Sequence, residues 1–200
     1  EADQKIFRPL GIIVEAEHKK PYTGLSSHCF LADIKKQYDL SLSVEELLTR
    51  KNAAYMELAQ ERTHVFPEMR TFVRLLKEHG YPLAVASGSS KEVIDAVLEA
   101  ADLLTYFDVT LSSSQVKKGK PAPDVFLEAA RLLNTPPQAC LVMEDSCYGV
   151  EAAKNAQMSC IAIPPAEAAP LADCFYEAEL LFAKGMAEFT AAKAFAWLRQ

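Results

Sequence analysis

Residues 139–149, ACLVMEDSCYG, run from an apolar strand-like segment through an acidic pair and a turn into a helix. The acidic pair is Glu144 and Asp145. Two carboxylates at the end of a buried strand repel each other and lose hydration, so a fold that has no function for such a pair avoids it. Mg²⁺ makes such a pair useful, because it prefers oxygen ligands and leaves coordination positions for phosphate and water. We therefore predict a metal-assisted phosphate site; the alternative is a helix-capping acid with a solvated neighbour.

The chain around this stretch alternates strands with helices from residue 67 onward. Strands are expected at 81–86, 107–111, 139–143 and 159–163, with intervening helices that include 69–79, 93–101, 124–133 and 149–156. Strands separated by helices of this length form βαβ units and a parallel sheet covered on both faces. Ligands of such sheets bind beyond the carboxyl ends of the strands.

The chain before residue 67 has a different, helical and polar pattern. Ser43 and Glu46 form a capping box that opens a helix running to about residue 62. We expect an α/β protein with two parts: a small α-helical domain over 1–66 and a Rossmann-like core with a parallel sheet over 67–200.

Composition narrows the classes of function. Half of the 200 residues are apolar, which suffices for a sizeable core, and the net charge of −6 argues against nucleic acid as the main partner. No apolar run is long enough for a membrane span. The five cysteines are odd in number and show no CxxC spacing, which favours a reduced, cytoplasmic compartment.

A second expected strand end carries hydroxyl groups. Ser87 follows the strand at 81–86, and Gly88 and Ser89 lead into a helix N-terminus. A hydroxyl, free backbone N–H groups and the positive end of a helix suit a phosphate. The alternative is ordinary N-capping by Ser89 with Glu92.

A third strand end leads to a basic loop. Lys120 precedes Pro121, which restricts the lysine to extended geometry and so fixes its direction. A fixed ammonium group can neutralise a phosphoryl group or hold an aspartate; the alternative is a solvated loop. The order of hydroxyl, lysine and acid pair, each after an expected strand, is more specific than any single member.

These motifs resemble the haloacid dehalogenase (HAD) superfamily, in its β-phosphoglucomutase-like branch with a helical cap. Residues 85–89 (VASGS) resemble the second family motif, 118–124 (KGKPAPD) the third, and 142–146 (VMEDS) with Gly149 the fourth. The tripeptides at 24–26 (GLS) and 50–52 (RKN) resemble cap elements that face the substrate. The resemblance covers nearly the whole chain.

The resemblance implies a role for each matched residue. Ser87 would bind the transferring phosphoryl group, and Lys120 would neutralise charge on it and on the nucleophile. Glu144 and Asp145 would hold Mg²⁺. The implied substrate-binding residues are Gly88, Ser89, Gly24, Leu25, Ser26 and Lys51.

The chain departs from the family pattern at the first motif. That motif, D-x-D, supplies an aspartate nucleophile and an aspartate general acid/base, and no D-x-D occurs in these 200 residues. The tripeptide at 15–17 (EAE) imitates it but stands too close to Gly24. We expect the first strand and the nucleophile to lie upstream. A second departure is Gln157, which occupies a turn position where glycine is frequent.

The resulting expectation is a Mg²⁺-dependent phosphatase that hydrolyses a small, sugar-like phosphorylated metabolite through an aspartyl phosphate. A phosphosugar mutase is the first alternative; Lys51 could grip a second phosphate, but Ser27 and His28 stand where such mutases carry an arginine. A non-catalytic binding homologue is the second alternative, and a dehalogenase is disfavoured because it needs no Mg²⁺. We expect a monomer or weak homodimer that binds neither nucleic acid nor membrane.

Overall fold

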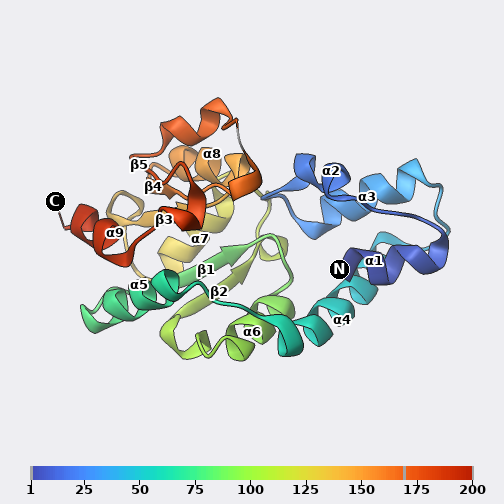
Figure 1. The fold of residues 1–200 in the computed structure, drawn as a ribbon, viewed down its shortest axis with the longest axis horizontal. Helices are drawn as coiled ribbons and strands as arrows, with labels where there is room; N and C mark the ends of the chain where they lie inside the picture. The colour runs from blue at the N-terminus through green and yellow to red at the C-terminus, as the bar shows by residue number, and fades with distance from the viewer. Residues whose placement is uncertain (1, 169, 200) are drawn as a thin grey trace.

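The computed structural model describes residues 2–168 and 170–199, and its N-terminal helices lie on one side of an α/β region (Figure 1). Ser43 and Glu46 form a capping box at the start of α4 (Val44–Arg62). The Glu46 amide donates to Ser43 Oγ (3.1 Å), and the Ser43 amide donates to Glu46 Oε2 (2.7 Å). The capping box predicted from the sequence is therefore confirmed. The N-terminal helices, which form the helical region, are α1 (Ala2–Phe7), α2 (Ala16–Lys19), α3 (Ser27–Gln37) and α4 (Val44–Arg62).

The α/β region begins at Pro67, which occupies the first turn of its helix and has no N–H to leave unpaired there. The five strands are short and parallel wherever they pair. Its helices are α5 (Pro67–Glu78), α6 (Lys91–Ala100), α7 (Asp124–Leu132), α8 (Cys147–Asn155) and α9 (Ala191–Leu198); its strands are β1 (Ala84–Ser87), β2 (Val109–Ser112), β3 (Leu141–Glu144), β4 (Ser159–Ala162) and β5 (Leu180–Leu181).

The strands form two sheets instead of the single sheet expected. One sheet has the order β1-β2, with Ser87 beside Ser112, and the other has the order β3-β4-β5, with Glu144 beside Ala162. Within residues 2–168 and 170–199 no backbone hydrogen bond joins β1 to β3. Each of these two strands therefore has one unpaired edge in the described part of the chain.

Helix packing nevertheless holds β1 and β3 in one layer. On one face, Val125 of α7 belongs to a core cluster that contains Val142 of β3 and packs against Ala86 of β1. On the other face, α5 places Phe72 in a cluster with Met143 and Val73 in a cluster with Val85. Successive strand residues point to opposite faces, so α5 and α7 cover the two sheets from opposite sides.

The helical region packs on the α/β region through α4, which lies against α6. Within the helical region α1 and α3 both pack on α4. No helix in the described part of the chain has the length and apolar character that crossing a bilayer requires.

The turn after α8 keeps its left-handed conformation without glycine. Gln157 adopts φ 58° there, so the departure from the family pattern at this position leaves the turn geometry unchanged.

Candidate active site

Lys120 and Glu144, both predicted as site residues, meet at the carboxyl ends of β1 and β3. Lys120 Nζ and the carboxylate of Glu144 form an ion pair whose side chains are only 5% and 7% exposed. Lys120 Nζ also donates to the Ala86 carbonyl at 3.4 Å. One ammonium group thus connects the end of β3 with the edge of β1, across the division between the two sheets.

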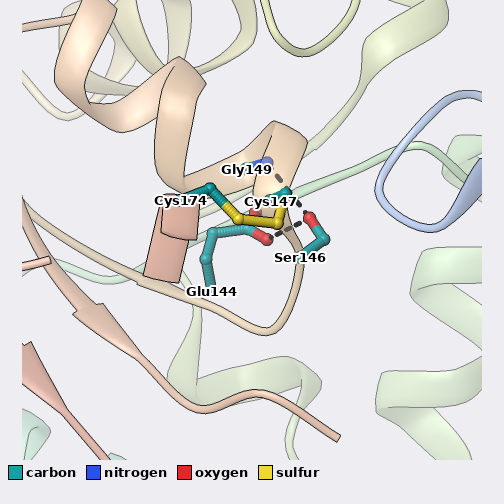
Figure 2. Close-up of a disulfide and its surroundings, with 5 residues drawn as sticks. All are labelled: Glu144, Ser146, Cys147, Gly149 and Cys174. Atoms are coloured by element: carbon teal, nitrogen blue, oxygen red, sulfur yellow. Dashed lines mark hydrogen bonds between the residues drawn. A yellow bond between two sulfur atoms is a disulfide. The ribbon is translucent and has the colours of Figure 1, made fainter. Parts of the chain in front are cut away.

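Glu144 is fixed from its other side by the first turn of α8 (Figure 2). Ser146 Oγ donates to Glu144 Oε2 at 3.0 Å and accepts from the Gly149 amide at 3.1 Å. A Cβ at position 149 would overlap the Glu144 carboxylate. The glycine therefore makes room for the acid to lie directly on the helix, and Ser146 caps the helix at the same time.

Asp145 has a different environment from its neighbour. Its side chain reaches solvent, yet desolvation and the adjacent Glu144 charge raise its pKa, while Lys120 opposes that shift. Within residues 2–168 and 170–199 no three acidic, histidine or cysteine side chains gather into a metal-binding group. The oxygen donors suit a hard cation, but Glu144 already bonds Lys120 and Ser146, so Asp145 is the more accessible of the two carboxylates.

Ser87 ends β1 as expected, half-buried beside the loop to α6. Its hydroxyl accepts a hydrogen bond from the Ser89 amide at 3.2 Å, and Ser112 Oγ donates to the Ser89 carbonyl at 2.6 Å. The N-cap of α6 is Ser90, so the alternative of capping by Ser89 is wrong. Ser89 instead lies in the loop between Ser87 and the N-cap of α6.

Three of the four residues of the helical region that were expected to face the substrate line a cavity of about 120 Å³. Leu25, Ser26 and Lys51 contribute to it, together with Lys19 and Tyr22, which belong to none of the sequence motifs. Gly24 lies outside this lining and contacts the α/β region instead.

Lys51 is buried and already paired within the helical region. Its Nζ lies 3.2 Å from Asp3 Oδ1 and 4.9 Å from the centre of the Phe30 ring, and the residue is 5% exposed. Desolvation lowers the pKa of Lys51, which the Asp3 charge opposes, and Lys19 also pairs with Asp3. The sequence gives no sign of Asp3, because the pair joins two helices far apart in the chain.

A disulfide between Cys147 and Cys174 fastens the start of α8 to the 3₁₀ helix Asp173–Glu177 (Figure 2). The two Cα atoms are 5.5 Å apart. The sequence expectation of reduced cysteines is wrong for this pair, because a spacing of 27 residues carries no recognisable signature. Cys29, Cys140 and Cys160 are thiols.

Residues 2–163 match the family model described as haloacid dehalogenase-like hydrolase. The chain belongs to this family. It is 35% identical over 164 residues to the chloroplastic protein SUPPRESSOR OF QUENCHING 1 of Arabidopsis thaliana, covering 79% of this chain and 15% of that protein. It is 35% identical over 126 residues to hexitol phosphatase B of Escherichia coli K12, covering 63% of this chain and 57% of that protein.

A solved structure shares the fold of this chain. CbbY from Rhodobacter sphaeroides in complex with phosphate superposes with a TM-score of 0.84 at 25% identity, covering 94% of this chain and 86% of that chain. This HAD chain thus has the expected Rossmann-like α/β fold, while it spans only 15% and 57% of the two curated relatives above.

Proposed function

We propose that this HAD chain carries most of the active site of a Mg²⁺-dependent phosphatase acting on small phosphorylated sugars or polyols. The observation that carries the proposal is the buried Lys120–Glu144 pair, in which Lys120 also bonds the carbonyl of Ala86, the residue that precedes Ser87 at the end of β1. Phosphoryl transfer depends on positioning and charge neutralisation, and this arrangement supplies a fixed cation and a hydroxyl at one sheet end. The hexitol phosphatase relative supports the substrate class.

The unpaired inner edges of β1 and β3 support a proposal for the position of the nucleophile. We propose that a strand from outside residues 1–200 pairs with the unpaired edges of β1 and β3 and brings a D-x-D motif to the level of Lys120. Both faces of that layer are already covered by α5 and α7, so an apolar strand would be buried there. Pairing would also satisfy the backbone groups of two sheet edges.

The proposed reaction has two in-line steps. The aspartate carboxylate forms a bond to phosphorus as the ester oxygen leaves and takes a proton from the second aspartate of the motif. The second aspartate, now a carboxylate, takes a proton from water as the water oxygen attacks the phosphorus of the aspartyl phosphate, which regenerates the first carboxylate and releases inorganic phosphate. Lys120 neutralises the phosphoryl oxygens throughout, and the Ser87 hydroxyl donates to one of them. Asp145, with Glu144, would hold Mg²⁺, whose charge would further stabilise these oxygens.

The helical region would act as the cap that selects the substrate, through the cavity lined by Leu25, Ser26 and Lys51. The mutase alternative rested on Lys51 as the cation for a second phosphate, but Lys51 is already paired with Asp3. This favours release of phosphate over its return to a second position of the sugar.

Substitution of Asp145 by Asn tests the proposal in the full-length protein. We expect the wild type to release phosphate from hexitol and sugar phosphates only with Mg²⁺, and Asp145→Asn to lower kcat/KM by at least about a hundredfold, since charge stabilisation at the phosphoryl group is lost. Asp173→Asn, an exposed acid of the 3₁₀ helix, is the control and should retain activity. Undiminished turnover by Asp145→Asn would refute the metal assignment. A wild type that binds phosphate esters without turnover would support the binding homologue.

A further inference from the structure

The loop at residues 24–27 lies directly on the α/β region through two glycines. Gly24 adopts φ +90°, and a Cβ there would overlap Ser146 Oγ and lie 2.7 Å from Ser146 Cβ. A Cβ on Gly88 would collide with the Leu25 carbonyl oxygen. The Ser27 amide donates to the Gly88 carbonyl at 3.2 Å. Because neither glycine has a side chain, the two backbones approach more closely here than other residues would allow.

Ser146 lies at this contact, where it is buried and hydrogen-bonded on two sides. It is 2% exposed, and its hydroxyl both donates to Glu144 Oε2 (3.0 Å) and accepts from the Gly149 amide (3.1 Å). Gly24 closes the remaining side. A hydroxyl that is bonded on two sides and blocked on the third has one rotamer available.

Glu144 is the residue that this rotamer fixes. Its carboxylate has Ser146 on one oxygen and Lys120 on the other. Removal of the loop from Ser146 would open space for other Ser146 rotamers, which cannot donate to Glu144, and the carboxylate would then keep only its pairing with Lys120. The chain of contacts therefore runs from the helical region through one hydroxyl to the acid.

We infer that Ser146 is a positioning residue, through which contact of loop 24–27 with the α/β region sets the orientation of the Glu144 carboxylate. The orientation of the Glu144 carboxylate therefore depends on whether loop 24–27 contacts the α/β region. Its catalytic consequence rests on the proposed function, but the coupling itself does not.

Gly24→Ala in the full-length protein tests the inference, with Gly11→Ala as the matched control. Both glycines lie in the helical region at positive φ, but a Cβ at Gly11 meets nothing within 4 Å, so the two variants share backbone strain and differ in the overlap with Ser146. We expect hydrogen exchange of the Ser27 amide to become at least about tenfold faster in Gly24→Ala than in Gly11→Ala, because the contact opens locally.

The carboxyl ¹³C signal of Glu144, assigned through Glu144→Gln, reports the second half of the coupling. We expect it to shift in Gly24→Ala and Ser146→Ala and to stay at the wild-type position in Gly11→Ala. Thr190→Ala removes the N-cap bond of α9, whose donor is the Lys193 amide, and controls for loss of a helix cap alone.

Two results would overturn the inference. Unchanged Ser27 exchange in Gly24→Ala would show that Gly24 does not hold the contact, and an unchanged Glu144 signal despite faster exchange would show that the acid is independent of it. Neither measurement needs substrate, metal or turnover, so a protein without phosphatase activity can still satisfy or refute the coupling.

Discussion

Replacement of Lys120 by Ala is expected to lower the free energy of unfolding by about 3–5 kcal/mol, as for other buried ion pairs that lose one partner. Glu144 is 9% exposed, and in this variant its charge would keep only the hydrogen bond from Ser146. The Lys120 bond to the Ala86 carbonyl is lost as well, which weakens the link between the two sheets. Urea denaturation followed by circular dichroism measures the effect.

The partly exposed pair of Lys154 and Glu179 provides the matched control, with side chains 34% and 38% exposed. Lys154→Ala should lower the free energy of unfolding by at most about 1 kcal/mol, because water screens and solvates the remaining carboxylate. The double variant Lys120→Met/Glu144→Gln removes both charges and should recover much of the loss. Equal losses of unfolding free energy in Lys120→Ala and Lys154→Ala would contradict the view that Lys120→Ala leaves the Glu144 charge buried and uncompensated.

Much of the fold was predictable because its signals are local. The apolar strands and amphipathic helices after residue 67 each show their period within a short window, and Ser43 and Glu46 mark the start of α4 by themselves. By contrast β5 contains only Leu180 and Leu181, which is too short for any period to stand out. The division of the strands into two sheets was not predictable, because the strand order depends on pairing between segments that lie far apart in the sequence.

The candidate site was predictable where topology decides it. Carboxyl ends of parallel strands share one edge of a sheet, so Ser87, Lys120 and Glu144 were expected to gather there. The contacts that modify their roles depend on side chains from distant segments. Burial of Lys51 against Asp3 and the seating of Gly24 on Ser146 leave no pattern in the sequence.

Removal of the disulfide is expected to produce the second large loss of stability. The double variant Cys147→Ser/Cys174→Ser should lower the free energy of unfolding by about 3–4 kcal/mol, the chain-entropy estimate for a closed loop of this length. The two cysteines are 27 residues apart, and the loop between them contains β4. Thermal and urea denaturation under non-reducing conditions measure the change.

Cys29→Ser controls for the loss of a thiol alone, because Cys29 is exposed and forms no disulfide. This substitution should change the free energy of unfolding by at most about 0.5 kcal/mol. Dithiothreitol should destabilise the wild type by as much as the double substitution does and leave the double variant unchanged. If dithiothreitol has no effect on the wild type, Cys147 and Cys174 are thiols in solution, and α8 is fastened by packing and by the Ser146 cap alone. If dithiothreitol destabilises the protein but the Glu144 carboxyl signal stays at the wild-type position, the disulfide contributes stability without orienting the acid.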